Sequence, residues 1–446
     1  MPSSTRILVL ASVICIATLV VPLGLAGRQT AMTNVERGRA EVMLDQVRSE
    51  ISKHYYDKNF HGLNLDARYQ QYKKFLEQKR TMSDALRVIA AFVAGLKDSH
   101  TFLEPPTLVE REDYGYVVEM IGDRCYVVHV RPGSDAEKKL HAGDEVLSLN
   151  RYVVNRQDLW PLLYDLNSLQ PVVATLVRRR TPGGQVQDEL VKASSYVGQR
   201  IVDMTFDNGD AGFWNIMLDE EQRIHELRQR YVEVGDVMIW KVPAFLMSED
   251  DLHRMLGIAR KHKALILDLR GNPGGNVQVL EELVGGVLGP DVQIAQRVGR
   301  KKMKPSVSRK SGSVFTGDMI VLVDSQSASA AELFARVMQL HHRATVIGDR
   351  TSGSVMEARF YPLQQGSDTR IFYGVSITDA DLIMADGQSL ENHGVVPDEI
   401  LLPTGDDLAA GRDPVLVRAA AKLGVTLDPK TAGGFFPFEW HALSRE

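Results

Sequence analysis

Apolar and polar residues follow one another in four distinct patterns along the 446-residue chain. An apolar run opens the chain, and residues 34–103 then carry apolar side chains at helical spacing, as at Val47 and Ile51. Residues 114–197 alternate β-rich runs with turn signals, whereas strand-like and helix-like segments alternate from Val237 onward. The pattern therefore predicts an α+β chain with several domains.

The alternating region predicts a largely parallel sheet covered by helices. Its strand-like stretches are residues 237–240, 264–269 and 319–323, and its helix-like stretches are residues 250–262, 277–288 and 329–341. Residues 297–310 are rich in Arg and Lys, so they are expected to form a solvated loop, with a lid over a cleft as the alternative. A polar stretch at 220–230 is expected to be helical and to precede the sheet.

The N-terminal region has the three parts of a secretory signal. Arg6 precedes the uncharged apolar run 7–21, and small residues follow, with cleavage predicted after Ala26. Residues 7–26 are also just long enough to span a bilayer, so an uncleaved membrane anchor is the alternative. Either route predicts an exported protein, periplasmic or extracellular.

Composition and charge narrow the functional classes. The net charge is −5, and it becomes −6 when removal of residues 1–26 takes away Arg6. Because this negative charge does not favour binding to nucleic acid, nothing indicates a nucleic-acid partner. Of the two cysteines, Cys15 lies in the leader and only Cys125 follows it, so a cleaved product has no intramolecular disulfide. No cluster of His, Cys, Asp and Glu has metal-ligand spacing, so neither a metal nor another cofactor is expected.

A serine at the start of a helix is the first candidate for chemistry. Residues 324–332 follow the apolar stretch 319–323, which predicts a strand, a tight turn and a helix with Ser329 near its first turn. Unpaired N–H groups and the helix dipole favour negative charge at that place. Such a serine is more commonly an N-cap, and a nucleophile is the alternative.

Three further segments carry candidate chemistry. Residues 268–276 end a strand with a glycine-rich turn, whose N–H groups can approach a ligand closely, as an oxyanion hole requires. The turn matches neither the phosphate loop nor the dinucleotide-binding pattern, so nucleotide binding is not expected. His100 follows Ser99 at the end of a helical stretch, and Glu391 lies in the turn-rich segment 386–398. Taken alone, each of these residues is explained by an ordinary cap or loop.

Together the segments resemble the tail-specific, or carboxyl-terminal processing, serine peptidases in order and spacing. The matching motifs are Ser329-Ala330-Ala331-Glu332, residues 268–275, Thr351-Ser352-Gly353 and residues 391–398. Residues 130–154 also resemble the centre of a PDZ domain, which binds an extended chain end by strand addition. The resemblance implies an α+β multidomain fold with a leader (1–26), an N-terminal helical cap (28–106), a PDZ-like β domain (112–195), a ClpP- or crotonase-like α/β protease core (200–405) and a C-terminal extension (406–446).

A missing lysine selects one branch of this family. The branch with a Ser-Lys dyad has its lysine shortly after the Thr-x-Gly turn, but here Ser354 follows that turn and the next lysine is Lys422. The chain instead resembles the branch that includes the tricorn core protease, which uses a Ser-His pair, a serine nucleophile and a late glutamate. This resemblance implies Ser329 as nucleophile and His100 as general base.

The resemblance also assigns the supporting groups. It implies that Glu391 orients His100 directly or through Ser99. Backbone N–H groups of Gly274 or Gly275, and of Ala330, are expected to hold the oxyanion. Rival bases are His393, His341 and His342, rival nucleophiles are Ser325, Ser327 and Ser352, and Glu332 is interpreted as a first-turn charge that complements the helix dipole.

The expected function is peptide-bond cleavage in exported or unfolded polypeptides, including cleavage near their C-termini, through an acyl-enzyme on Ser329. Polypeptide substrates are the expected partners, an uncleaved leader would add membrane attachment, and the oligomeric state is left open. A non-catalytic peptide- or lipid-binding protein on the same fold is the main alternative, and an acyl-CoA enzyme of the crotonase type is a third.

Overall fold

The structure is a computed structural model that describes residues 31–106, 110–197, 228–366 and 371–440. The leader at 1–26 and most of the polar stretch at 220–230 lie outside these residues. Within the part of the chain that is described, no helix combines the length and apolar character needed to cross a membrane.

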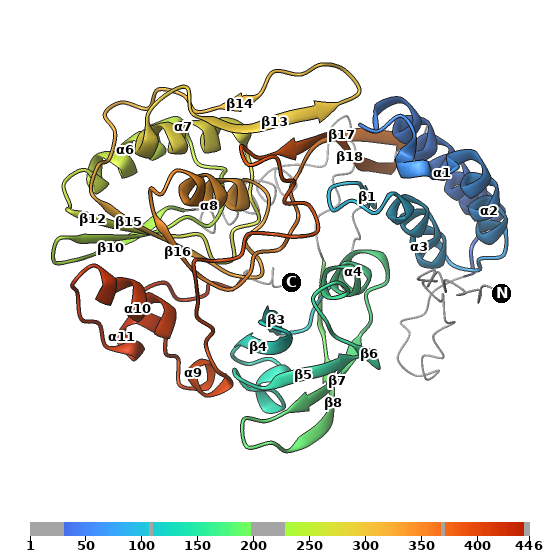
Figure 1. Ribbon diagram of the computed structural model, residues 1–446. Helices are drawn as coiled ribbons and strands as arrows, with labels where there is room; N and C mark the ends of the chain where they lie inside the picture. The colour runs from blue at the N-terminus through green and yellow to red at the C-terminus, as the bar shows by residue number, and fades with distance from the viewer. Residues whose placement is uncertain (1–30, 107–109, 198–227, 367–370, 441–446) are drawn as a thin grey trace, which may run out of the picture.

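Three helices at the N-terminal end pack on one another, at the right of Figure 1. They are α1 (Asn34–His54), α2 (Leu65–Glu77) and α3 (Met82–Val93). The capping box of Thr33 and Glu36 begins α1. Buried side chains of the helices, such as Leu44 and Phe92, share a hydrophobic cluster with Val375 of β18 (Ile371–Ile383). The expected helical region is therefore confirmed, and it packs on a strand from the other end of the chain.

The predicted parallel sheet is present at the left of Figure 1. Its strands, in spatial order, are β10 (Arg230–Val234), β11 (Val237–Lys241), β12 (Ala264–Asp268), β15 (Asp318–Val323), β16 (Thr345–Gly348) and β19 (Glu399–Ile400). Each neighbouring pair is parallel except β10 with β11. Because the strands are parallel, the carboxyl ends of β12 and β15 lie side by side, with Asp268 opposite Leu322.

Both faces of this sheet are buried, as parallel sheets require. The covering helices are α6 (Glu249–Ala259), α7 (Val277–Leu288) and α8 (Ala330–Leu340) on one face, and α10 (Pro414–Lys422) and α11 (Pro429–Gly433) on the other. Alternate residues of β12 divide between the faces, since Leu265 and Leu267 join the cluster of α6 to α8, whereas Ala264 and Ile266 join that of α10. The short helix α9 (Gly405–Ala409) precedes α10.

A second, antiparallel sheet joins the N-terminal helices to the parallel sheet region. It contains β1 (Phe102–Glu104), β13 (Gln293–Gly299), β14 (Ser306–Val307), β17 (Met356–Gln365) and β18. The predicted solvated loop at 297–310 was therefore wrong at Arg297–Gly299, which pairs with β18, and at Ser306, which is buried. The Arg and Lys residues of this segment favoured the prediction of a solvated loop. In the fold, however, the Arg297 guanidinium pairs with the Glu357 carboxylate of β17 instead of facing water.

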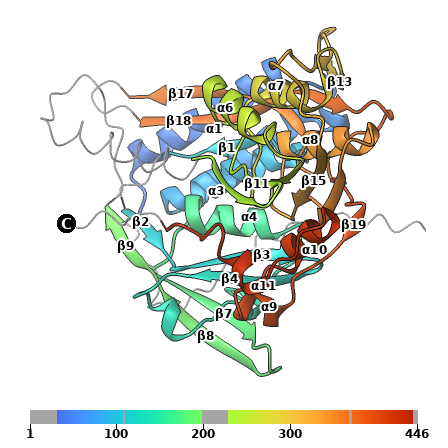
Figure 2. The same ribbon diagram turned by 90° about the vertical axis from the view of Figure 1, so that its left-hand side faces the viewer.

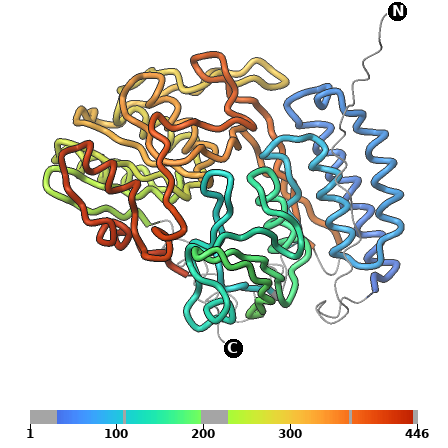
Figure 3. Tube along the Cα trace, turned by 60° about the horizontal axis from the view of Figure 1, so that its bottom comes forward, coloured from blue at the N-terminus to red at the C-terminus, as the bar shows by residue number. Residues whose placement is uncertain are grey.

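The β-rich region forms its own sheet, which Figures 1 and 2 show below the rest of the molecule and Figure 3 shows between the parallel sheet and the N-terminal helices. The strands are β3 (Tyr116–Ile121), β4 (Arg124–Val130), β5 (Glu145–Leu149), β6 (Tyr152–Val153), β7 (Ala174–Arg180) and β8 (Val186–Lys192), accompanied by α4 (Leu159–Tyr164) and the separate pair β2 (Glu110–Asp113) and β9 (Ser194–Val197). The edge strand β3 reaches the turn before α8, where Ser325 Oγ donates a 2.6 Å hydrogen bond to the Met120 carbonyl.

Candidate active site

Ser329 lies in a strained backbone conformation at the start of α8. Its φ of 54° and ψ of −117° lie in a region that residues other than glycine rarely adopt. Strain of this kind costs about 1–3 kcal/mol and persists where surrounding contacts enforce it. In the α/β-hydrolases, a serine at a sharp turn between a strand and a helix presents its hydroxyl for attack.

The contacts that enforce this conformation converge on a buried carboxylate. The Ser329 N–H lies 2.9 Å from the Ser354 carbonyl and 3.0 Å from Glu332 Oε2. Glu332 is 0% exposed and also accepts hydrogen bonds from Thr351 Oγ1 and from the N–H groups of Gly353 and Ser354. Burial raises the pKa of Glu332 to about 7, although the four donors act to lower it. Glu332 does lie in the first turn, but it anchors a loop instead of facing solvent.

Replacing Glu332 by alanine is expected to destabilise the fold by about 3 kcal/mol, because buried donors would lose their acceptor. Urea unfolding at pH 8 measures the change. The matched control is Glu77→Ala, since Glu77 is exposed and its carboxylate forms no hydrogen bond among the described residues. Equal unfolding midpoints for the two variants would contradict the anchoring role.

The glycine-rich turn lies against Ser329. A Cβ on Gly274 would be 2.6 Å from Ser329 Cβ and 3.0 Å from Ala330 N, and its φ is +98°, so only glycine fits. The Gly274 N–H is already engaged, because it donates a 2.8 Å hydrogen bond to Asn272 Oδ1. Among the hydrogen bonds of the described residues, the N–H groups of Gly275 and Ala330 have no acceptor. Within the described residues these two N–H groups are therefore available as donors, one directly after Ser329 and one directly after Gly274.

His100 is fixed by a network between the N-terminal helices and β18. The strand β1, which follows His100, pairs with β18, so that Phe102 lies opposite Ser376. Asp98 Oδ1 accepts hydrogen bonds from the His100 N–H at 3.1 Å and from Thr378 Oγ1 at 2.7 Å. Burial lowers the pKa of His100 below 6.5, although the nearby Asp98 charge opposes this effect. The imidazole is therefore held in its neutral form near pH 7.

A serine and a glutamate determine which nitrogen of His100 carries the proton. Ser99 Oγ lies 2.9 Å from Glu391 Oε2 and 2.7 Å from His100 Nδ1. A hydroxyl has one proton, and an ionised carboxylate only accepts. Ser99 Oγ donates its hydrogen bond to Glu391 Oε2, so it can only accept from His100. His100 Nδ1 therefore carries the proton and donates to Ser99 Oγ, and Nε2 is left unprotonated. Burial raises the pKa of Glu391, whereas donation from the Val355 and Ser99 N–H groups lowers it.

Two consecutive residues join the histidine and serine segments. The Val355 N–H donates a 2.8 Å hydrogen bond to Glu391 Oε2, and the adjacent Ser354 carbonyl accepts from the Ser329 N–H. The structure therefore brings His100, Ser99 and Glu391 to the loop that holds Ser329. The hydrogen bonds of these described residues do not include a direct one from Ser329 Oγ to His100, and such bonds commonly form only when substrate is bound.

The rival residues have other roles. Ser327 Oγ donates to the Leu269 carbonyl, Ser325 Oγ donates to Met120, and Ser352 Oγ lies 2.8 Å from Ser354 Oγ. His393 Nδ1 lies 2.7 Å from the Glu391 carbonyl, and its side chain is exposed. His341 and His342 follow α8, about 15 Å from its beginning at the usual rise per residue.

The supporting side chains Asp98, Thr378 and Asn272 were given no role in the predicted site. Asp98 was visible two residues before His100, where a carboxylate can accept hydrogen bonds from following N–H groups. Thr378 gave no such local signal, because its partner Asp98 comes from a distant segment. Asn272 has a local partner in the Gly274 N–H, but its bond to the Val242 carbonyl also joins distant segments.

A serine at a strand-to-helix turn, a neutral histidine and a carboxylate are the side chains that serine hydrolases use. Residues 236–401 match the model of peptidase family S41, and residues 39–94 match the model of the tricorn protease C1 domain. Residues 236–401 are therefore similar to the serine-type peptidases of family S41, and the chain resembles the tail-specific and carboxyl-terminal processing proteases.

Individual relatives agree with this assignment. The chain is 25% identical over 315 residues to "Tail-specific protease" of Haemophilus influenzae, covering 66% of this chain and 42% of that protein. It is 24% identical over 364 residues to "Carboxyl-terminal-processing protease" of Picosynechococcus, covering 79% and 80%. The crystal structure of mature CPAF has a TM-score of 0.60 at 17% identity, covering 84% of this chain and 94% of that one, so it supports the fold. The matched region is less than half of the Haemophilus protein, so its substrates do not transfer directly.

Proposed function

We propose that this chain is an exported serine peptidase that cleaves unfolded polypeptides through an acyl-enzyme on Ser329. His100 Nε2 takes the proton from Ser329 Oγ as the oxygen attacks the scissile carbonyl carbon. The same nitrogen then returns the proton to the leaving amine as the peptide C–N bond breaks. Water, deprotonated by His100, attacks the ester and releases the second product.

The oxyanion formed in each addition step is stabilised by backbone donors. Gly275 and Ala330 fit this role best, because neither N–H group donates a hydrogen bond among the described residues. Ala330 directly follows Ser329, and Gly275 directly follows Gly274, which lies against Ser329. Gly274 supports the arrangement by allowing the turn to approach Ser329 closely. Donors of this kind contribute about 10²–10³ in rate each in comparable sites.

The observation that carries the proposal is the pair of consecutive hydrogen bonds that connects Glu391 through Ser99 to His100. It fixes the tautomer that a general base needs. A non-catalytic peptide- or lipid-binding protein would need neither this tautomer nor the strained backbone at Ser329. Both features therefore favour catalysis over the binding alternative.

The sheet of β3 to β8 is proposed to be a PDZ-like domain that receives substrate C-termini. Tyr114 and Gly115 precede β3, which is the edge strand of this sheet, and a PDZ domain adds a peptide strand to such an edge. The contact of Ser325 with Met120 of β3 joins this strand to the turn that holds Ser329. A bound chain end would therefore lie close to the nucleophile segment.

Digestion of an unfolded protein and of matched peptides tests this function. The purified chain is expected to cleave the unfolded protein, and to cleave a peptide with a free C-terminal carboxylate faster than its amidated form. Failure to cleave any unfolded substrate would contradict the peptidase activity. Equal rates for the two peptides would contradict only the recognition of C-termini.

Removing the hydroxyl of Ser99 is expected to lower kcat by about 10²–10⁴-fold with little change in KM, because His100 would lose its orientation. Glu391→Gln should give a similar loss, since an amide can turn its N–H toward Ser99. Ser99→Thr keeps the hydroxyl and is expected to retain most of the activity, which distinguishes positioning from general packing. Steady-state kinetics measure all three variants, and a Ser99→Ala variant with unchanged kcat would contradict the relay.

A further inference from the structure

We propose that Glu249, His253 and Glu282 form a binding site for a divalent transition-metal ion, for which Zn²⁺ is the test case. The site lies between α6 and α7, apart from Ser329 and His100, and does not depend on the proposed peptidase activity. The sequence does not show metal-ligand spacing here, because the third side chain comes from a different helix.

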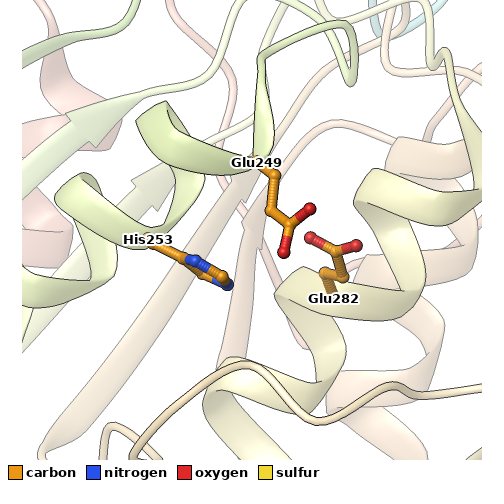
Figure 4. A group of neighbouring side chains, drawn as sticks. All are labelled: Glu249, His253 and Glu282. Carbon is orange, nitrogen blue, oxygen red and sulfur yellow. The ribbon is translucent and has the colours of Figure 1, made fainter.

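The three side chains have the placement that a metal ion requires. Glu249 and His253 are four residues apart on α6, so they share one face of the helix, and Glu282 comes from α7. One imidazole nitrogen and one oxygen from each carboxylate all lie within 4.8 Å of one another. Figure 4 shows the three side chains converging in the space between the helices. The ligands of tetrahedral zinc are about 3.3–3.6 Å apart, so metal binding would draw the three atoms somewhat closer together.

An unsatisfied nitrogen gives independent support for a ligand. His253 Nε2 is shielded from solvent and has no hydrogen-bond partner. Buried polar nitrogens normally have a partner, so this atom indicates a missing group. Metal coordination by a neutral imidazole nitrogen would supply that partner.

The charges around the site are also uncompensated. Among the described residues, neither Glu249 nor Glu282 forms an ion pair or a side-chain hydrogen bond. Two arginines that adjoin these helices are already paired, since Arg254 binds Asp251 and Arg309 binds Glu281. Two adjacent carboxylates without a cation repel each other, and one divalent ion neutralises both.

The ligand types select the class of ion. Mg²⁺ and Ca²⁺ prefer sites made of oxygen ligands alone, whereas an imidazole with two carboxylates suits Zn²⁺, Mn²⁺ or Fe²⁺. Three protein ligands leave a fourth position for water.

Such an ion would clamp two helices that border the glycine-rich turn. Asn276 caps α7 directly after Gly275, and Ser248 caps α6 three residues after Phe245. Phe245 pairs with Gly275, because its N–H donates to the Gly274 carbonyl and its carbonyl accepts from the Asn276 N–H. Metal binding is therefore expected to stabilise the arrangement that holds the Gly275 N–H in place.

Isothermal titration of the metal-free full chain with Zn²⁺ tests the site. One ion per chain is expected to bind at this site, and His253→Gln and Glu282→Gln should each weaken that binding by at least about 10–100-fold. Asp250→Asn is the matched control, since Asp250 is an exposed acid on the same helix turn and should bind Zn²⁺ as the wild type does. His342→Gln controls for binding at exposed histidines.

Thermal unfolding separates loss of the site from loss of the fold. Zn²⁺ should raise the unfolding temperature of the wild type and of Asp250→Asn, but not that of His253→Gln. In EDTA, Glu282→Gln should unfold at or above the wild-type temperature, because it removes one of two repelling charges. Wild-type affinity for Zn²⁺ in both His253→Gln and Glu282→Gln would overturn the proposal, as would the absence of a Zn²⁺-dependent shift in the wild type.

Discussion

Replacing Ser329 by alanine is expected to lower peptide cleavage by about 10⁴–10⁶-fold without loss of the fold. The physical reason is that Ser329 Oγ supplies the electron pair that attacks the substrate carbonyl, and no neighbouring hydroxyl replaces it. Ser325 and Ser327 lie close in sequence, but their hydroxyls donate to backbone carbonyls. Hydrolysis of an unfolded protein, followed by the appearance of new N-termini, measures the loss.

Two further variants sharpen this prediction. Ser352→Ala is the matched control, because it removes an exposed hydroxyl from the adjacent loop and should leave activity near that of the wild type. Ser329→Gly should be inactive and as stable as the wild type or more stable, since glycine adopts a φ of 54° without strain. Substantial activity in Ser329→Ala would contradict the nucleophile assignment.

Replacing His100 by alanine is expected to lower kcat/KM by about 10⁴-fold or more, because Ser329 would lose its proton acceptor. His341→Ala is the matched control: this exposed histidine lies at the far end of α8, and its loss should leave activity unchanged. Equal activities of His100→Ala and the wild type would assign the base elsewhere.

The pH profile gives a second test of His100. The base must be unprotonated, and burial lowers the pKa of His100 from its ordinary value of 6.5. The pH at which kcat/KM drops to half on the acidic side should therefore lie below 6.5. Activity then persists at pH values where a solvent-exposed histidine is already protonated. A midpoint above pH 6.5 would contradict a buried neutral imidazole as the base.

The parallel sheet and its helices were predictable because local pattern and tertiary structure agree there. The predicted helix at 277–288 coincides with α7, since its apolar residues face the sheet and Asn276 and Gly289 mark its ends. The segment at 297–310 was not predictable in the same way. Its arginines indicate solvent, but Arg297 pairs with Glu357 across a sheet that only the folded chain assembles.

The candidate site shows the same division between local and distant information. Ser329 and its helix were visible in a short stretch of sequence, whereas the positive φ of Ser329 and its bonds to Ser354 and Glu332 require the folded loop. The bond from Ser99 to Glu391 joins residues 292 positions apart, so spacing alone gives no sign of it. Likewise, Glu249 and His253 form a visible helical pair, but Glu282 is brought to them only by the packing of α6 on α7.

The measurement that most directly tests the central claim is mapping of a fluorophosphonate adduct by mass spectrometry. The reagent is expected to phosphonylate the wild type once, on Ser329, and to react far more slowly with His100→Ala because no base activates the hydroxyl. Ser329→Ala should remain unlabelled under the same conditions. An adduct on Ser325, Ser327 or Ser352, or undiminished labelling of Ser329→Ala, would contradict the account.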